Sequence, residues 1–284
     1  MSSPHMPADL SAARVKEAAL IALLRSAGDV VVGFSGGVDS AYLACVAVEA
    51  LGADRVTAVI GRSASYPEEQ WANARTVAVR VGLTVREVDT DELADPRYAA
   101  NPSNRCYFCK SELWSRLRPI ADAVGAGVLV DGTNADDLCE YRPGARAAAE
   151  HGVRSPLAEV GLTKSEIRAL SRERGIPTWS RPSSPCLASR LPYGTPVTVE
   201  RLRAVERAER VLRELGVTGD LRVRHHGDLA RVELTSSELD RWLGARDVAE
   251  LERAVRTAGF ARVAIDLHGF RSGSLNVLEG IVRE

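Results

Sequence analysis

Apolar positions in the first half of the chain form short strand-like runs that alternate with stretches of helical composition. This alternation favours a parallel sheet covered by helices on both faces. We therefore predict an α/β fold with a doubly wound parallel sheet. The predicted strands are Val30–Phe34, Arg55–Ile60, Thr84–Val88 and Val128–Val130.

Helices are predicted between and after these strands. Pro67 opens one of them, with two glutamates in its first turn. The run Thr163, Lys164, Ser165 and Glu166 has the spacing of a capping box. It starts a second helix, which ends before Gly175. The helix that Pro67 opens is predicted to extend over Pro67–Val81. Two further helices are predicted in this half, Ser40–Leu51 and Lys110–Val124.

The stretch Ser180–Thr198 is rich in proline, serine and glycine, which marks a loop or a domain boundary. We place a nucleotide-binding domain at 12–195 and a smaller α+β domain at 196–284. The smaller domain is expected to contain two helices, a hairpin turning at Gly227 and Asp228, and a last strand. These elements are Val199–Leu215, Leu221–His226, Leu229–Leu234, Ser237–Ala258 and Ala261–Leu267.

The amino-acid composition bears on which classes of function are possible for this protein. The 284 residues include 45% hydrophobic and 26% charged residues, with a net charge of −1. A core of useful size is therefore available, and no global field draws the protein to nucleic acid or to an anionic membrane. No apolar run approaches the roughly 20 residues that span a bilayer, and the first residues do not resemble a signal peptide. We expect a cytoplasmic protein that binds neither nucleic acid nor membrane.

The segment Ser35, Gly36, Gly37, Val38, Asp39 and Ser40 lies between a predicted buried strand and a helix. Glycines let the backbone approach phosphate oxygens, and the serine hydroxyls and the helix N-terminus supply donors. The segment lacks the P-loop lysine and is not the dinucleotide fingerprint. It resembles the SGGxDS motif of the PP-loop ATP-pyrophosphatases, which release pyrophosphate and leave AMP on the substrate.

That resemblance implies that the protein binds ATP and that Asp39 helps to hold Mg²⁺, an ion that prefers oxygen ligands. A second segment follows a later predicted strand, where ligands of open α/β sheets gather. It is Asp131, Gly132, Thr133 and Asn134. The sequence allows two interpretations of this segment, an ordinary turn or a nucleotide contact.

Three of the five cysteines have a pattern that suggests chemistry. Cys106 and Cys109 lie three residues apart, and two such thiolates can hold a metal or cluster if a further ligand joins them. Burial beside Tyr107 and Phe108 is the alternative. Cys186 lies beside Ser189 and Arg190, and nearby cations favour a thiolate, so it is a candidate nucleophile. The remaining two, Cys45 and Cys139, are interpreted as structural.

Taken together, the later motifs resemble the ATP-dependent sacrificial sulfur transferases, the LarE-like family. The resemblance covers nearly the whole chain. Its motifs are SGGVDS at Ser35–Ser40, NRCYFCK at Asn104–Lys110, PCLASR at Pro185–Arg190, RVRHHGDLARVEL at Arg222–Leu234 and GFRSGSLN at Gly269–Asn276.

The resemblance implies a substrate and two routes for sulfur. The substrate is a pyridinium mononucleotide whose carboxylates become thiocarboxylates during synthesis of the nickel-pincer nucleotide cofactor. In one route Cys186 attacks the adenylate and gives up its sulfur. In the other, Cys106, Cys109 and Cys186 hold a four-iron (4Fe–4S) cluster, and three cysteines favour this route. Asp39, Cys186, Ser189 and Arg190 are the expected catalytic residues, and a homo-oligomer, a hexamer, is implied.

Arg222 and Arg224 alternate along a predicted strand, so both can point from one face. With the resemblance, they are predicted to bind the phosphate of the substrate. The alternative is a solvated basic strand edge that discourages edge pairing.

Two other functions compete with this interpretation. A tRNA-thiolating enzyme would share the nucleotide loop and three cysteines, but it usually needs a broad basic surface or an RNA-binding module. A metal-binding or sulfide-storage protein that does not cleave ATP is the second. Pyrophosphate release distinguishes this binding protein from both enzymes.

Overall fold

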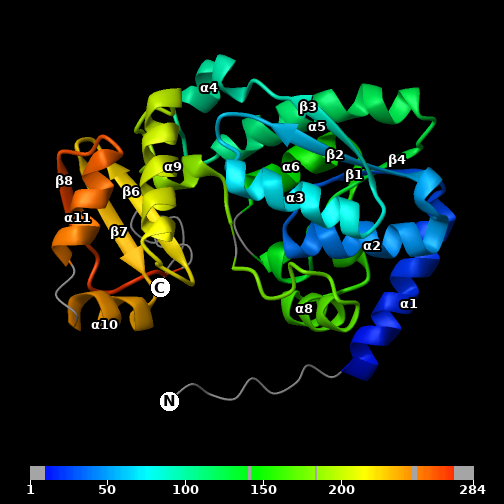
Figure 1. Ribbon diagram of the computed structural model, residues 1–284. Coiled ribbons are helices and arrows are strands. Elements are labelled where there is room, and N and C mark those ends of the chain that lie inside the picture. The colour runs from blue at the N-terminus through cyan, green and yellow to red at the C-terminus, as the bar shows by residue number, and fades with distance from the viewer. Residues whose placement is uncertain (1–9, 140–141, 183, 245–247, 272–284) are drawn as a thin grey trace. The chain divides into compact units, whose positions relative to one another are not determined.

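The computed structural model describes residues 10–139, 142–182, 184–244 and 248–271. The chain divides into two compact units that interleave along the sequence (Figure 1). The sheet unit contains the chain up to Ser63, Glu68–Glu92 and Cys106–Arg181. The second unit contains Ala64–Pro67, Leu93–Arg105 and the chain from Pro182 on. The single boundary predicted between residues 195 and 196 stays a prediction about domain organisation.

The sheet unit is built on five parallel strands in the order β3-β2-β1-β4-β5, which confirms the α/β fold class. The three valines that open β1 are buried, because this strand is central and covered on both faces. Strand β5 was not predicted, since two residues give no periodic pattern. The strands are β1 (Val30–Gly33), β2 (Val56–Arg62), β3 (Thr84–Asp89), β4 (Val128–Val130) and β5 (Val153–Arg154).

Helices lie on both faces of this sheet (Figure 1). Trp114 and Leu117 of α5 and Ala147 of α6 form one core with Val31 and Leu129 of the sheet. The longer helices of the unit are α1 (Leu10–Ala27), α2 (Val38–Leu51), α3 (Glu68–Arg80), α5 (Arg105–Ala123), α6 (Pro143–Glu150) and α8 (Lys164–Glu173). The short ones are α7 (Pro156–Glu159) and the 3₁₀ turns Ala53–Arg55, Glu92–Ala94 and Asp136–Cys139.

Two helix boundaries bear on the sites. The predicted capping box is present, because the Thr163 side chain accepts from the Glu166 N–H and Glu166 reaches back to the Thr163 N–H. The prediction that a helix begins at Lys110 was wrong by five residues, since α5 begins at Arg105 and takes the cysteine pair into its first turns. The Arg105 N–H donates to the Pro102 carbonyl at 3.0 Å, which starts the turn early.

The second unit holds a three-stranded sheet in the order β6-β7-β8. The predicted hairpin of β6 and β7 is confirmed as antiparallel, and β8 joins β7 in parallel. The predicted helix Ser237–Ala258 is described as two, α10 and α11, with 245–247 outside the described residues. The elements are α4 (Pro96–Ala99), a 3₁₀ turn (Leu187–Arg190), α9 (Val199–Glu214), β6 (Leu221–His226), β7 (Leu229–Leu234), α10 (Ser236–Gly244), α11 (Val248–Thr257) and β8 (Arg262–Ile265).

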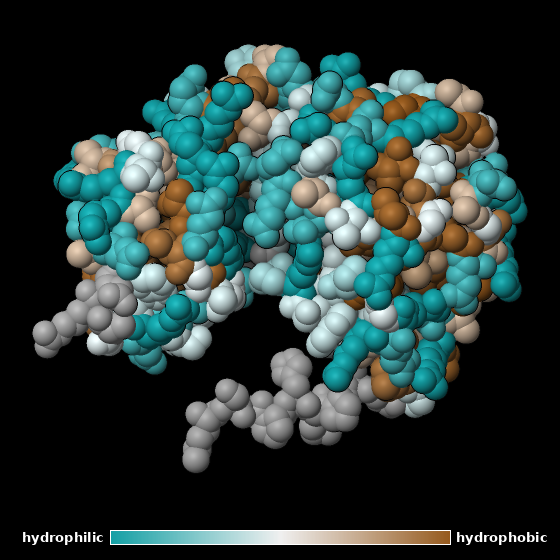
Figure 2. Space-filling view, in the orientation of Figure 1, coloured by the Kyte–Doolittle hydropathy of each residue, from teal (hydrophilic) through white to brown (hydrophobic). Residues whose placement is uncertain are grey.

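The core of the second unit lies between this sheet and its helices. Val223 and Val232 of the sheet are fully buried together with Leu212 of α9 and Leu251 of α11. Figure 2 shows polar side chains over much of the visible face, with apolar side chains gathered mainly over the sheet unit. Among the described helices, none has the length and apolarity needed to cross a membrane.

Candidate active site

The predicted nucleotide loop joins β1 to the N-terminus of α2. Its two serines close the turn: the Ser35 and Ser40 hydroxyls are 3.1 Å apart, and Ser40 Oγ accepts from the Ser35 N–H at 3.3 Å. Gly36 has φ +69°, and an added Cβ there would lie 2.5 Å from the Ala74 Cβ of α3. The N-cap of α2 is Gly37, which has no side chain to occupy the helix N-terminus, so this end can receive an anion.

The loop after β4 lies directly against the nucleotide loop. An added Cβ on Gly132 would be 2.8 Å from the Ser40 backbone nitrogen, so only glycine permits this approach. Strands β1 and β4 are neighbours, and the chain runs outward from them in opposite directions. Their carboxyl ends therefore flank the topological switch point, where open α/β sheets bind ligands. Of the predicted residues, the structure thus brings Ser35–Ser40 and the loop at Gly132 together.

The polar side chains of this second loop hold its own shape. Asp131 accepts from the Thr133 hydroxyl at 2.9 Å and from the Ser155 hydroxyl at 2.8 Å. Asn134 is buried, and its Oδ1 accepts from the Asp136 N–H at 3.0 Å. These contacts account for the turn without a ligand, so direct contact of Asp131, Thr133 or Asn134 with nucleotide stays a prediction.

Asp39, in the first turn of α2, carries the main electrostatic feature of the site. One carboxylate oxygen forms an ion pair with Lys164 Nζ, from the first residue of α8. The other, Oδ1, is buried and has no hydrogen-bond partner among the described residues. A buried carboxylate oxygen without a donor costs free energy unless a cation or donor arrives. Asp39 therefore fits the role of a Mg²⁺ ligand when Mg·ATP binds.

A second carboxylate lies near Asp39. Burial raises the pKa of Asp137, and the negative charge of Asp39 adds to the rise, while the Asn134 N–H, Arg142 and Lys164 oppose it. Asp137 forms an ion pair with Arg142 at 2.6 Å. The site thus concentrates negative charge beside an anion-binding loop, an arrangement that a divalent cation would balance.

The cysteine pair lies in the first turns of α5. Cys106 is exposed and Cys109 is half-buried. Tyr107, the first of the two aromatic residues between them, is held by α6: its hydroxyl donates to Glu150 at 2.6 Å, and the Arg146 guanidinium lies 4.3 Å from its ring centre. Residues three apart on a helix share a face, so both thiols can serve one ligand. The alternative of two buried apolar cysteines does not fit the exposure of Cys106.

Cys186 precedes a short 3₁₀ turn of the second unit and is half-buried. Arg190, 2% exposed, holds this loop: its Nη1 donates to the Pro185 carbonyl at 2.5 Å, the Cys186 carbonyl at 3.0 Å and the Ser189 hydroxyl at 3.1 Å. The next residue, Leu187, donates its N–H to the Ser65 carbonyl at 2.8 Å. Arg190 thus shapes the backbone around the candidate nucleophile.

The predicted phosphate-binding arginines belong to a buried group that we call the arginine cluster: Arg190, Arg222 and Arg224 with Glu209 and Glu233. Arg224 donates from Nε and Nη2 to one Glu233 oxygen at 3.0 and 2.9 Å, and from Nη1 to the Ser189 carbonyl at 2.9 Å. Arg190 forms a bidentate pair with Glu209, at 2.9 Å for both bonds. The interpretation of these arginines as a solvated strand edge does not fit, because Arg222 and Arg224 are 5% and 6% exposed.

Arg222 differs from its neighbours in the cluster. It donates to the Leu221 carbonyl at 2.6 Å and lies over the Phe270 ring at 4.9 Å. Burial lowers its pKa to about 10, and the positive charge of Arg190 adds to the effect. Arg222 therefore stays protonated at neutral pH, and its charge would gain from an anion. Part of the Gly269–Asn276 motif, from residue 272 on, lies outside the described residues.

Comparison with known proteins bears on this geometry. Residues 21–185 match the family model described as NAD synthase, which spans the nucleotide loop and ends just before Cys186. The pyridinium-3,5-bisthiocarboxylic acid mononucleotide synthase of Lactiplantibacillus plantarum is 38% identical over 92% of this chain and 94% of its own length. The chain belongs to the LarE-like family of PP-loop proteins. As a member of that family it is an ATP-using sulfur transferase.

Two further relatives match this chain to different extents. An uncharacterized protein of Synechocystis is 45% identical over 86% of this chain and 91% of its own length. A glutamine-hydrolyzing GMP synthase of Aeropyrum pernix is 32% identical over 65% of this chain but only 39% of its own length. The Lactiplantibacillus plantarum and Synechocystis proteins thus match most of this chain, whereas the likeness to the GMP synthase covers a smaller part of it.

The LarE-like cysteine motifs are divided between the units. Cys106 and Cys109 lie in the sheet unit, and Cys186 lies in the second unit. Within the described parts of the chain, no group of three or more histidine, cysteine, aspartate or glutamate side chains could hold a metal ion. A cluster ligated by all three thiols therefore stays a proposal.

The two cysteines interpreted as structural differ. Burial raises the pKa of the Cys45 thiol, in keeping with a packing role inside α2. Cys139 is exposed, so burial does not support its interpretation as a structural residue, which stays a prediction. Its polar neighbours in the 3₁₀ turn Asp136–Cys139 keep that segment at the surface.

Sequence reasoning missed several residues of the site. Lys164 was noticed only as part of the capping box, although the same turn aims its side chain at Asp39. Glu209 and Glu233 were not singled out, yet they neutralise the buried arginines. The signal for Glu233 was present: it lies opposite Arg222 in the β6–β7 register.

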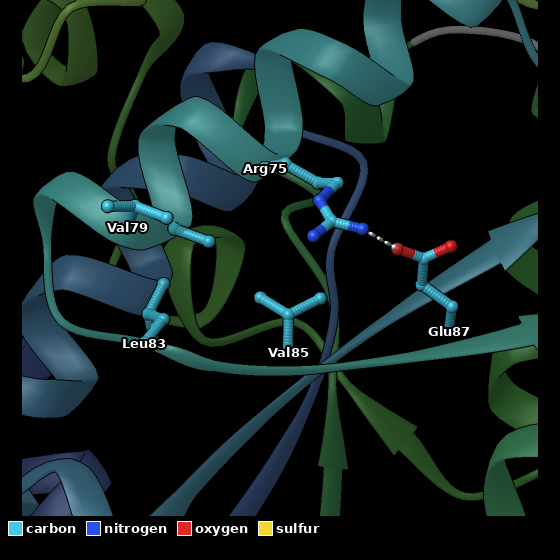
Figure 3. A pocket seen from close by; sticks show the side chains of 6 residues that line it. Arg75, Val79, Leu83, Val85 and Glu87 are labelled. Atoms are coloured by element: carbon cyan, nitrogen blue, oxygen red, sulfur yellow. Dashed lines mark hydrogen bonds and ion pairs between the residues drawn. The ribbon is translucent and has the colours of Figure 1, made fainter.

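A separate pocket lies between α3 and the edge strand β3 (Figure 3). Val79, Leu83 and Val85 line it, together with the Arg75–Glu87 ion pair at 3.1 Å. None of the predicted site residues lines this pocket. The candidate active site is therefore identified by loop chemistry and charge rather than by this concavity.

Proposed function

We propose that this protein uses Mg·ATP to adenylate the carboxylates of a pyridinium mononucleotide and converts them to thiocarboxylates, in nickel-pincer nucleotide biosynthesis. The observation that carries the proposal is the buried Oδ1 of Asp39, which has no hydrogen-bond partner among the described residues and lies in the glycine-rich loop at the switch point. The printed name of the Lactiplantibacillus plantarum relative, which matches this chain almost end to end, supports the substrate.

The proposed reaction has two steps, adenylation of a carboxylate and attack by sulfur on the adenylate. A substrate carboxylate oxygen bonds to the α-phosphorus of ATP, and pyrophosphate leaves. A sulfur nucleophile then attacks the carbonyl carbon and expels AMP, which is a far better leaving group than an oxide ion. In our proposal the Ser35–Ser40 loop and the α2 N-terminus bind the phosphates, and Asp39 holds the Mg²⁺ that screens them.

Sulfur has two proposed sources. If Cys186 supplies it, the thiolate forms a thioester, and cleavage of its Cβ–Sγ bond with loss of the α-proton leaves dehydroalanine and a thiocarboxylate. Alternatively, Cys106, Cys109 and Cys186 hold an iron–sulfur cluster, since thiolates are the donor set of such clusters. A bound cluster would supply sulfide. The three filled cysteine positions favour the cluster.

The substrate phosphate is proposed to bind at the arginine cluster. Arg222 is the first candidate, since burial and neighbouring cations lower its pKa more than the charges of Glu209 and Asp220 raise it, and a bound anion would oppose that lowering. Arg224 forms an ion pair with Glu233. Ser189 and Arg190 are proposed to position the Cys186 loop. The homo-oligomer is likewise a proposal, which light scattering of the purified protein would test.

The deciding experiment incubates anaerobically purified protein with Mg·ATP and the dicarboxylated pyridinium mononucleotide. We expect AMP and pyrophosphate in equal amounts and a product heavier by one oxygen-to-sulfur exchange at each carboxylate. ADP and orthophosphate would exclude the PP-loop chemistry. Turnover with tRNA in place of the small nucleotide would favour the RNA-thiolating alternative, and no ATP cleavage with any substrate would favour a binding protein.

A parallel measurement separates the two sulfur sources. Iron and sulfide content with a broad visible absorption, and an intact Cys186 peptide after several turnovers, support the cluster. A colourless protein whose Cys186 peptide has lost the mass of hydrogen sulfide supports sacrifice. Activity that survives in the Cys106→Ala, Cys109→Ala double variant would eliminate the cluster.

A further inference from the structure

Lys164 and Asp39 form an ion pair within the sheet unit that uses only one of the two carboxylate oxygens of Asp39. Lys164 Nζ contacts Oδ2, whereas Oδ1 is buried and has no hydrogen-bond partner among the described residues. The side chains of Lys164 and Asp39 are 32% and 20% exposed, so the pair as a whole is not sealed from solvent. The two oxygens of this carboxylate are therefore not equivalent, because one already has a cationic partner and the other can accept one.

The start of α8 holds Lys164 in place. Its backbone N–H donates to Asp136 Oδ2 at 2.8 Å. The capping box of this helix includes Glu166, and Lys16 of α1 donates to Glu166 Oε1 at 2.7 Å. All of these residues belong to the sheet unit. Because its neighbours fix the backbone of Lys164, the side chain loses less conformational freedom when it binds the carboxylate.

The position of Lys164 restricts how Asp39 can bind a metal ion. Ca²⁺ takes about 6–8 oxygen ligands and accepts both oxygens of one carboxylate. Mg²⁺ is smaller, needs near-octahedral geometry and usually keeps several water ligands beside one or two carboxylates. With Oδ2 held by an ammonium group, Asp39 can offer only Oδ1 to an ion. The ion pair thus suits Mg²⁺ and disfavours Ca²⁺.

Affinity and stability explain this lysine less well. Its positive charge repels an incoming cation, so it lowers the affinity of the carboxylate for any divalent ion. An ion pair that is partly exposed also contributes little to the free energy of unfolding. The pair does provide a charge-assisted hydrogen bond that is fixed on one oxygen. Discrimination between ions therefore accounts for the pair better than tight binding or stabilisation does.

We propose that Lys164 is a specificity-determining residue, which makes Asp39 a ligand through one oxygen and so selects Mg·ATP over Ca·ATP. This inference rests on the proposed function, because it takes Asp39 as the metal ligand of the nucleotide loop. Lys164 acts through the Asp39 carboxylate and does not contact the reacting atoms.

Calorimetric titration of the full-length protein with α,β-methylene ATP tests this selection without turnover. The methylene group replaces the oxygen of the bond that would be cleaved, so binding is measured by itself. The ratio of the dissociation constants with Ca²⁺ and with Mg²⁺ measures the selectivity, and we expect the unaltered protein to bind the Mg²⁺ complex more tightly. Lys164→Met keeps the length of the side chain but removes the ammonium group. This variant should shift the ratio toward Ca²⁺ about ten- to 100-fold.

Two further variants control for donor chemistry and for charge. Lys164→Arg keeps a cationic donor for Oδ2 and should retain most of the selectivity of the unaltered protein. Arg172→Met removes one positive charge from an exposed position in the last turn of the same helix, so its ratio should match that of the unaltered protein. The unfolding midpoint in urea shows whether each variant is folded.

The outcomes separate this inference from the proposed function. Equal affinity for the two complexes in the unaltered protein, an unchanged ratio in Lys164→Met or an equal shift in Arg172→Met would overturn the selective role. Weaker binding of the analogue to Lys164→Met without any divalent cation would also overturn it, because Lys164 would then bind the phosphates directly. Failure of the proposed function would appear elsewhere, as the absence of pyrophosphate and thiocarboxylate when the unaltered protein is given Mg·ATP and the mononucleotide.

Discussion

The nucleotide loop of the sheet unit and the arginine cluster of the second unit both hold buried charge, but they balance it differently. Asp39 is paired with Lys164 at the N-terminus of α8, and within the described part of the chain its other carboxylate oxygen has no hydrogen-bond partner. Arg224, in contrast, is locked to Glu233, with both side chains 7% exposed or less. The first arrangement leaves a place for a cation, whereas the second is largely satisfied within the protein.

This difference distinguishes charged residues that serve ligand binding from charged residues that stabilise the fold. A carboxylate with an unsatisfied oxygen contributes little to folding, so its removal should mainly affect ligand chemistry. Removing one partner of a buried ion pair lowers the free energy of unfolding, because the remaining charge is buried without a partner and without hydration. Substitutions at Asp39, Glu233, Arg222 and Asp137 should separate effects on ligand binding from effects on stability.

Asp39→Ala should reduce ATP cleavage to AMP and pyrophosphate at least about 100-fold, because a lost metal ligand should cost no less than a lost outer-shell partner. The unfolding midpoint in urea should stay within experimental error of the unaltered protein. Asp122→Ala, on the exposed face of α5, is the matched control and should keep full activity. A destabilised Asp39→Ala protein would contradict the comparison.

Glu233→Ala should lower the free energy of unfolding by about 3–5 kcal/mol, because it leaves Arg224 and Arg231 without their shared carboxylate. Urea unfolding followed by circular dichroism measures this loss. Asp228→Ala breaks an exposed pair with Arg262, and because solvent screens such a pair the free energy of unfolding should hardly change. Equal losses in the two variants would mean that the buried pair is not the stabilising feature we infer.

Arg222→Ala should weaken binding of the pyridinium mononucleotide about tenfold or more, since a charge-assisted hydrogen bond contributes roughly 1.5–3 kcal/mol. Affinity for Mg·ATP should not change. Calorimetric titration with each ligand measures both, and the exposed Arg262→Ala is the control. Unchanged substrate affinity would move the phosphate site away from Arg222.

The smallest effect concerns pH. Because the pKa of Asp137 is raised in the folded protein, the folded state holds this proton more tightly than the unfolded chain. Its contribution to stability is therefore fully present below the ordinary value of 3.8 and is lost as pH rises through the folded pKa. Asp137→Asn should remove this fall from the curve of unfolding free energy against pH. An unchanged curve would show that burial does not perturb Asp137.

Much of the fold and part of the site could be predicted from sequence. Local patterns were sufficient where one segment contains its own signal: the β-branched run at Val30, the glycines of the nucleotide loop, the capping box at Thr163 and the β6–β7 hairpin. The start of α5 was misplaced, because the aromatic residues and cysteines after Arg105 hide its helical character.

The sequence by itself thus determined the fold class, the nucleotide loop and the cysteine motifs, since each can be recognised from residues that are contiguous in the chain. Only the tertiary structure decided the partners of the charged groups. It paired Asp39 with Lys164, Arg190 with Glu209 and Asn101 with the 192–197 loop. The physical reason is that burial turns charge and hydrogen-bonding capacity into requirements that must be met, and the residues that meet them come together only when the chain folds.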